Sequence, residues 1–234
     1  MKFKQFSLAA VSAAVVASFA LSACGGGGGS SGTPANGGGG TTVAKPNPVT
    51  TAPTTSCSTA GVAAASASTA TNVVCMLTSD GEIVVELYGD KAPITVANFM
   101  KYVDDGFYSN TIFHRVVRGF VVQGGGFTTG LVAKTATYPA ITLETNVGLS
   151  NTRGTIAMAR TSVANSATSQ FYFNTVDNSA SLDYTSASNP GYAVYGKVIS
   201  GLTVVDKIND EVQLTGVADT PATEVLLYWA KRIK

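Results

Sequence analysis

The sequence predicts a mainly β domain, built as a closed antiparallel barrel or as a sandwich. From residue 73 onward, short runs of β-branched and aromatic residues recur, and clusters of glycine, asparagine and serine separate them. Two segments alone have the residue spacing of an amphipathic helix. Many short strands with only two helices are typical of both architectures, and periodicity does not choose between them.

Each element of this domain has its own sequence signal. Two alternating apolar runs, 73–77 and 82–87, flank the turn sequence TSDG, so a β-hairpin opens the domain. A helix follows over 93–105, because apolar side chains recur at i, i+3, i+4 and i+7 between a proline and a glycine. A second, short helix is predicted at 202–208. The remaining strands are predicted at 112–116, 120–124, 155–159, 170–174, 192–199 and 224–232.

Residues 1–23 have the pattern of an export signal with a lipidation site. Lys2 and Lys4 precede an apolar run over 6–19, and the sequence LSAC, ending at Cys24, is similar to a bacterial lipobox, in which the cysteine is acylated. A transmembrane helix is the weaker alternative, because the apolar run is too short to span a bilayer comfortably. We expect acylated Cys24 to anchor the chain in the lipid bilayer of a bacterial cell envelope. Gly25 is not the aspartate that favours inner-membrane retention, so we expect the outer membrane, with the protein facing the periplasm.

Residues 24–72 predict a flexible tether between this anchor and a domain over 73–234. The segment consists mainly of glycine, serine, threonine, alanine and proline, and Lys45 is its only charged residue. Such a composition has too few large apolar side chains to bury a core.

Two cysteines, Cys57 and Cys75, remain once Cys24 is acylated. An even number in an oxidising compartment predicts a disulfide, which fastens the end of the tether to the first strand and contributes about 3 kcal/mol in the chain-entropy model. The alternative is a buried, free Cys75 with Cys57 unpaired.

The charge balance gives no sign of several classes of partner. Lys2, Lys4 and Lys45 precede the domain, so 12 of the 15 basic residues remain against 14 acidic residues, a net charge of −2. Since there is no basic stripe, we expect no nucleic-acid partner. One histidine and three scattered cysteines predict no metal site, and we expect no cofactor.

Two long motifs carry the functional signal. Residues 113–127 read FHRVVRGFVVQGGGF, and an arginine inside such an apolar strand requires a function that offsets its desolvation. The second motif reads NTRGTIAMAR at 151–160 and continues with SQFYF at 169–173. Together they closely resemble the signatures of the cyclophilin family of peptidyl-prolyl isomerases, most of all its periplasmic bacterial branch. The resemblance runs from residue 73 to the C-terminus and implies a closed eight-stranded antiparallel β-barrel capped by two α-helices.

This resemblance implies catalysis of prolyl cis-trans isomerisation, a reaction in which no bond is broken. Amide resonance imposes a barrier of roughly 18–20 kcal/mol, and an enzyme lowers it by stabilising a twisted amide whose nitrogen has regained its lone pair. Arg115 matches the arginine that donates hydrogen bonds to this nitrogen, and its fixed fork of donors suits that role. Gln123 matches a glutamine that binds the substrate backbone and helps to hold the arginine. Since no proton moves, His114 is interpreted as a structural histidine.

The resemblance also implies an apolar slot for the proline ring, lined by Phe120, Val121, Tyr172 and Leu182. Methionine is usual in place of Val121, and phenylalanine in place of Tyr172. A tyrosine hydroxyl in an apolar pocket requires a partner. Tyr172 therefore either reaches water or Arg115 at the rim, or the slot is reshaped.

Three more residues match the groove beside this proline slot. Arg160 stands at a position that contacts peptide through its main chain, Gln170 lines the groove, and the hydroxyl of Tyr192 donates a hydrogen bond to a substrate carbonyl. Arg118 departs from the usual proline, and we expect its side chain to point into solvent.

We therefore expect a monomeric isomerase that assists the folding of exported proteins and binds proline-containing unfolded or extended polypeptides. The alternative is a chaperone that binds proline peptides without catalysis, or a surface adhesion lipoprotein, which the altered Val121 and Tyr172 leave open, together with Ser181, where some family members have tryptophan. A barrel that carries a hydrophobic ligand inside is a weaker alternative, because small barrels fill their interior with side chains.

Overall fold

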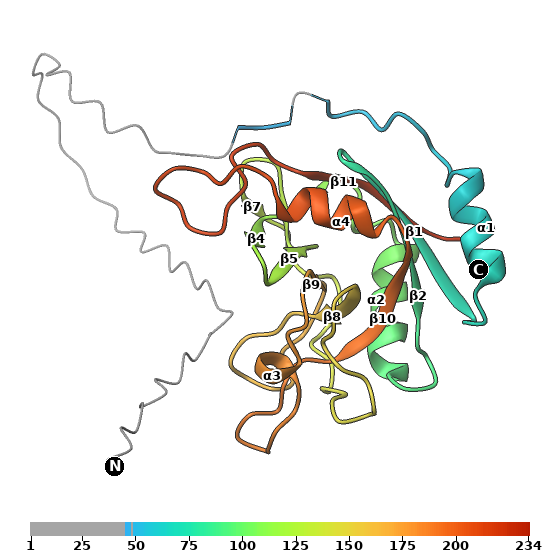
Figure 1. The fold of residues 1–234 in the computed structure, drawn as a ribbon, viewed down its shortest axis with the longest axis vertical. Coiled ribbons are helices and arrows are strands. Elements are labelled where there is room, and N and C mark those ends of the chain that lie inside the picture. Colours follow the sequence, from blue (N-terminus) through green and yellow to red (C-terminus); the bar gives the residue numbers. More distant parts are fainter. Residues whose placement is uncertain (1–44, 48) are drawn as a thin grey trace, which may run out of the picture.

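Figure 1 presents a computed structural model of the chain, in which residues 45–47 and 49–234 are described. The predicted signal peptide over 1–23 and the predicted acylation site Cys24 lie outside the described residues. The helices are α1 (Thr59–Ala67), α2 (Pro93–Asp104), α3 (Ser179–Leu182) and α4 (Leu202–Asn209). The strands are β1 (Asn72–Thr78), β2 (Gly81–Leu87), β3 (Thr111–Ile112), β4 (Arg115–Val117), β5 (Val121–Gly124), β6 (Phe127–Thr128), β7 (Val132–Ala133), β8 (Thr155–Met158), β9 (Phe171–Asn174), β10 (Val194–Ser200) and β11 (Leu226–Arg232).

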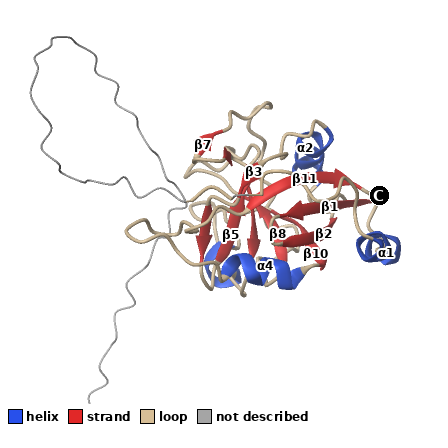
Figure 2. Cartoon of the chain, turned by 90° about the horizontal axis from the view of Figure 1, so that it is seen from above, coloured by secondary structure: helices blue, strands red, loops and turns tan. Residues whose placement is uncertain are grey.

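All of these strands belong to one curled antiparallel sheet, in the order β4-β5-β9-β8-β10-β2-β1-β11-β3-β6-β7. Figure 2 shows the sheet from above, with α2 on one side and α4 on the other. The prediction of a mainly β fold is confirmed. The closed eight-stranded barrel is not, because the sheet has 11 strands and no hydrogen-bonded pair among the described residues joins the outermost strands β4 and β7.

Some segments that look like one continuous strand in the sequence form two strands in the structure, because the chain changes its pairing strand or contains glycines. The predicted strand 112–116 becomes β3, which pairs with β11, and β4, which pairs with β5. Between them, the backbone N–H of Phe113 donates to the carbonyl of Val225 at 2.9 Å. Glycines also separate β5 from β6, and Gly125 there has a φ of 82°, a left-handed conformation that glycine adopts without a steric penalty.

The inner face of the curled sheet encloses a core rich in aromatic side chains. From α2, the fully buried ring of Phe99 lies 5.3 Å from that of Tyr108 and 5.2 Å from that of Tyr195, measured between centroids. On β9, Phe171 and Phe173 face this core. Because strand side chains alternate between the two faces, the residues between them point to the outer face.

A helix, α1, occupies part of the segment whose composition predicts a flexible tether. The hydroxyl and the N–H of Ser58, which precedes α1, both donate to the carboxylate of Glu82 on β2 at 2.7 Å. The neighbouring Cys57 forms a disulfide with Cys75 on β1, with 6.1 Å between the Cα atoms. The contacts of Ser58 with Glu82 are tertiary, so the alanine-rich composition of α1 gave no sign of them, whereas the cysteine count predicted the disulfide.

The segment before α1 also lies against the domain, along β11 (Figure 1). The hydroxyl of Tyr228 donates to the carbonyl of Val49, and the indole of Trp229 donates to the carbonyl of Thr54, both at 2.8 Å. Within the described residues, no helix is both long and apolar enough to cross a bilayer.

Candidate active site

A row of side chains crosses five adjacent strands on the outer face of the sheet. Arg115 on β4 is the register partner of Gln123 on β5, which in turn is the partner of Tyr172 on β9. The row continues through Ala157 on β8 to Val194 on β10. Residues directly opposite each other on neighbouring strands lie side by side. The sheet therefore brings residues of the two sequence motifs together.

A hydrophobic cluster, which we call the outer cluster, covers this row and is separate from the core. Its buried members are Val121, Ala157, Ala159, Tyr172, Leu182 and Val194, and Val117, Phe120, Leu149 and Tyr192 pack against them. The four predicted slot residues and Tyr192 thus lie together. Val121, Tyr172 and Leu182 are at most 3% exposed, whereas Phe120 and Tyr192 are half-buried. Phe120 and Tyr192 are therefore the two that a peptide at the surface reaches first.

The guanidinium of Arg115 is held on one side and unpaired on the other. Its Nη2 lies 3.2 Å from Oδ2 of Asp219, while its Nη1 is buried and has no hydrogen-bond partner among the described residues. On the neighbouring strand, Oε1 of Gln123 is also buried without a partner. The two side chains are register partners on neighbouring strands, and both unpaired atoms are covered in this structure.

Gln123 pairs with Gln170 rather than with the arginine. The Nε2 of Gln123 donates to Oε1 of Gln170 at 2.9 Å. The expectation that Gln123 helps to hold Arg115 therefore differs from the structure, in which Asp219 makes that contact. This pairing fixes the amide of Gln123, whose Oε1 is covered and has no partner among the described residues.

Of the two alternatives for Tyr172, the position at the rim is wrong, because its hydroxyl is buried and does not contact Arg115. It donates instead to Oδ1 of Asn151 at 2.9 Å, and burial raises the pKa of Tyr172 well above its ordinary value. The side-chain amide of Asn151 also donates to the carbonyls of Leu182 and Tyr192, at 3.2 and 3.4 Å. A single buried asparagine thus holds three residues of the outer cluster from below.

Two further asparagines extend this network to the β4–β5 turn. Asn178 donates to the carbonyl of Phe120 and to Oδ1 of Asn174, both at 2.8 Å, and Asn174 donates to Oδ1 of Asn151 at 3.1 Å. Sequence reasoning missed all three asparagines. The one available signal was that Asn151 opens the second motif.

Arg160 contributes through its side chain as well as its position. Its Nε donates to the carbonyl of Gly191 and its Nη1 to that of Thr161, both at 2.9 Å. The guanidinium lies 4.4 Å from the centre of the Tyr192 ring, a cation–π contact. Arg160 therefore fixes the ring of Tyr192 at the edge of the outer cluster.

Two other residues of the first motif, His114 and Arg118, have structural roles. Burial, with a smaller effect from the charge of Arg115, lowers the pKa of His114 to about 4, and its ring packs 4.4 Å from that of Phe127. His114 is thus neutral near pH 7. Arg118 does not point freely into solvent, because it donates to two carbonyls at the C-terminal end of α4, at 2.6 and 3.1 Å.

The described residues offer one group with the spacing of metal ligands, formed by Cys57, Cys75 and Glu82 within 4.8 Å of one another. Both sulfur atoms belong to the disulfide, so a single carboxylate remains. This group does not fit a metal ion.

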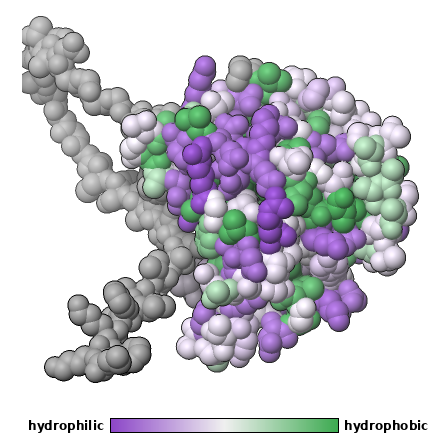
Figure 3. All heavy atoms as spheres, viewed as in Figure 1, coloured by the Kyte–Doolittle hydropathy of each residue, from purple (hydrophilic) through white to green (hydrophobic). Residues whose placement is uncertain are grey.

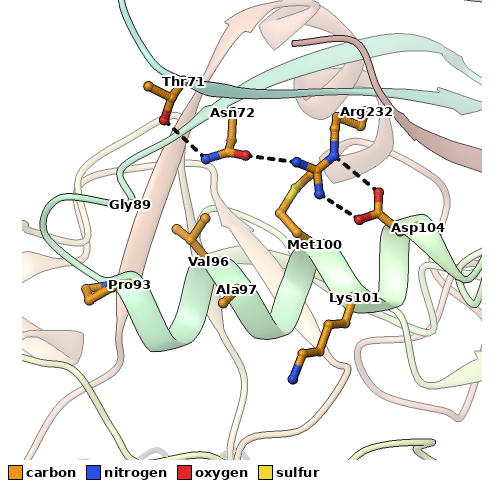
Figure 4. A pocket seen from close by; sticks show the side chains of 10 residues that line it. All are labelled: Thr71, Asn72, Gly89, Pro93, Val96, Ala97, Met100, Lys101, Asp104 and Arg232. Carbon is orange, nitrogen blue, oxygen red and sulfur yellow. Dashed lines mark hydrogen bonds and ion pairs between the residues drawn. The ribbon is translucent and has the colours of Figure 1, made fainter.

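A surface pocket of about 460 Å³ lies along α2, away from the predicted site (Figure 4). Arg232 and Asp104 form an ion pair of 2.6 Å in its wall, and none of the predicted site residues lines it. On the face drawn in Figure 3, hydrophilic and hydrophobic residues are mixed in small patches. The site is therefore identified by its hydrogen bonding and its register rather than by a deep cavity.

The curled sheet, the arginine with an unpaired donor and the outer cluster beside it define a cyclophilin-type site. The family model of cyclophilin type peptidyl-prolyl cis-trans isomerase/CLD matches residues 73–230, and the chain belongs to this family. The enzyme class predicted from the sequence is confirmed at this level.

Curated relatives agree with this assignment. The chain is 48% identical over 171 residues to peptidyl-prolyl cis-trans isomerase A of Dickeya dadantii, covering 72% of this chain and 87% of the relative. It is 52% identical over 132 residues to peptidyl-prolyl cis-trans isomerase B of Escherichia coli, covering 56% and 80%.

Solved structures show the same fold. A cyclophilin-type isomerase of Cryptosporidium parvum superposes with a TM-score of 0.59 at 24% identity, over 69% of this chain and 96% of that one. A structure of the same protein in the presence of the dipeptide Ala-Pro gives a TM-score of 0.58 at 25% identity, over 68% and 97%.

Proposed function

We propose that this chain is a lipid-anchored peptidyl-prolyl cis-trans isomerase that assists the folding of exported proteins. The observation that carries the site assignment is the strand register, which places Arg115 beside Gln123 and Gln123 beside Tyr172 of the outer cluster. The name shared by relatives at about half identity supports the reaction. The Ala-Pro dipeptide present with the Cryptosporidium parvum protein supports a proline-containing peptide as the ligand.

In the proposed mechanism, the proline ring packs against Phe120 and the outer cluster while the acyl part of the substrate rotates. The guanidinium of Arg115 donates to the prolyl nitrogen as the amide twists, which stabilises the lone pair that the loss of resonance restores. The Oε1 of Gln123 accepts a hydrogen bond from a substrate N–H. His114 stays neutral, and no step transfers a proton.

Arg115→Ala tests this site. We expect kcat/KM for a proline-containing tetrapeptide, measured in a protease-coupled assay, to fall about 100-fold or more, because the donor to the twisted nitrogen contributes roughly 3 kcal/mol to the transition state. Arg232→Ala is the matched control, since it removes an arginine bound in an ion pair at the distant pocket. Near-normal turnover by folded Arg115→Ala protein would contradict the mechanism. A wild-type protein that binds the peptide without accelerating its isomerisation would favour the non-catalytic chaperone.

The proposed anchor rests on the lipobox-like sequence at Cys24. We expect the full-length protein to partition into the detergent phase and the Cys24→Ser variant to stay in the aqueous phase. Cys57→Ser is the control, because it removes a cysteine outside the lipobox. Detergent partitioning by both variants would refute lipidation at Cys24. Membrane fractionation tests the proposed outer-membrane location, and light scattering tests the proposed monomer.

A further inference from the structure

We infer that Asp219 is a positioning residue for Arg115, holding its guanidinium in place beside Gln123 and the outer cluster. Asp219 lies in the loop between α4 and β11, which neither sequence motif includes. The inference rests on the proposed catalytic role of Arg115, and the experiment below separates the two.

Asp219 is the sole anchor of the guanidinium within the described part of the chain. Its Oδ2 lies 3.2 Å from Nη2 of Arg115, and no other described side chain or carbonyl contacts that guanidinium. A free arginine side chain samples many rotamers, and this freedom is lost when the transition state forms. A carboxylate that orients the fork in advance lowers this entropic penalty.

The position of Asp219 is itself determined by the strand that carries the arginine. The backbone N–H of Val116, the residue after Arg115, donates to the carbonyl of Asp219 at 2.7 Å. Asp219 has a φ of 60°, a left-handed conformation that asparagine, aspartate and glycine adopt more readily than other residues. Its backbone and its carboxylate therefore hold adjacent residues of β4, so the loop cannot shift without moving the arginine.

The geometry favours positioning over competition with substrate. Asp219 lies beside Nη2 alone, and Nη1, which is covered in this structure, has no partner among the described residues, so the ion pair takes up one arm of the guanidinium and not both. A carboxylate that competed with the substrate would instead lower activity when present, and its removal would raise kcat/KM.

The test uses two substitutions that suit the left-handed backbone. Asp219→Gly removes the carboxylate without backbone strain, and we expect kcat/KM for the tetrapeptide to fall about tenfold, mainly through kcat. Asp219→Asn keeps an acceptor oxygen, and we expect it to stay within about twofold of wild type. Asp206→Ala is the matched control, because Asp206 is ion-paired with Arg153 and is exposed to the same extent, 38% against 39%. We expect this control to stay within about twofold as well.

The double variant separates this inference from the role of Arg115. In the Arg115→Ala background, Asp219→Gly should cause no further loss, because a positioning residue acts only through the group that it positions. Unchanged or increased activity of Asp219→Gly, an equal loss in Asp219→Asn, or a further loss in the Arg115→Ala background would each overturn the inference. If Arg115→Ala alone remains fully active, the proposed catalytic role fails first, and the inference about Asp219 fails with it.

Discussion

Asn151→Ala should destabilise the protein more than any other single substitution beneath the outer cluster. The side chain is 1% exposed, and alanine removes the hydrogen-bond partner of three buried groups, the hydroxyl of Tyr172, one amide N–H of Asn174 and the carbonyl of Tyr192. The carbonyl of Leu182 keeps its backbone hydrogen bond from Tyr192, at 2.9 Å. Each stranded group costs about 1–3 kcal/mol, so we expect the free energy of unfolding to fall by about 4 kcal/mol.

A second substitution, Tyr172→Phe, tests the same hydrogen bond from its other partner. Tyr172→Phe alone removes one neutral hydrogen bond, and Oδ1 of Asn151 keeps the donor of Asn174, so we expect a loss of about 1 kcal/mol. In the Asn151→Ala background the same change removes a stranded hydroxyl and should therefore stabilise the protein. The sign of the effect of Tyr172→Phe thus reverses between the two backgrounds.

Urea unfolding measures both effects, with the chain's single tryptophan, Trp229, as a buried fluorescent probe. If Asn151→Ala lowers the free energy of unfolding by less than about 1 kcal/mol, the calculation is refuted, because water or a rearranged side chain must then satisfy the stranded groups. A destabilising Tyr172→Phe change in both backgrounds would refute the coupling.

Two further predictions concern stability. The pKa of His114 is about 4 in the folded state and 6.5 in the reference state, so the unfolded chain takes up a proton first on acidification. Stability should therefore fall between about pH 6.5 and pH 4 by roughly 3 kcal/mol, and His114→Gln should lack this part of the loss in urea titrations; an unchanged pH dependence would contradict it. Replacing Cys57 and Cys75 together by serine should lower the free energy of unfolding by about 3 kcal/mol, since the disulfide closes a loop with a sequence separation of 18. Two titratable thiols in the unfolded, non-reduced domain would show that the bond is absent.

The regular elements around the site were predictable because their signals are local. The alternation of apolar residues indicated strands at 120–124, 155–159 and 170–174, close to β5, β8 and β9. The helix predicted at 93–105 matches α2, whose apolar stripe faces the core. Alternation also determines which side chains share the outer face, so the residues that we propose to contact substrate follow from the motifs and the period of a strand.

The residues that hold the site could not be predicted in this way. Asp219 lies in a loop without periodicity and meets Arg115 only after β11 has closed against β3 and β1. Ser58, next to α1, contacts Glu82, and β11 contacts the segment that precedes α1. Both contacts likewise join residues far apart in the chain. No local pattern indicates such contacts, because their partners are chosen by the folded sheet.

Tyr172 shows how one such contact changes the meaning of a substitution in the slot. A tyrosine in place of phenylalanine suggests a more polar slot, since a buried hydroxyl needs an acceptor. Here the acceptor is Oδ1 of Asn151, which lies beneath the outer cluster, so the hydroxyl points inward and the ring stays among apolar neighbours. The same asparagine holds the carbonyls of Leu182 and Tyr192. The extra hydroxyl therefore adds an interior hydrogen bond to the slot and leaves its outward surface apolar, which is what a proline ring requires.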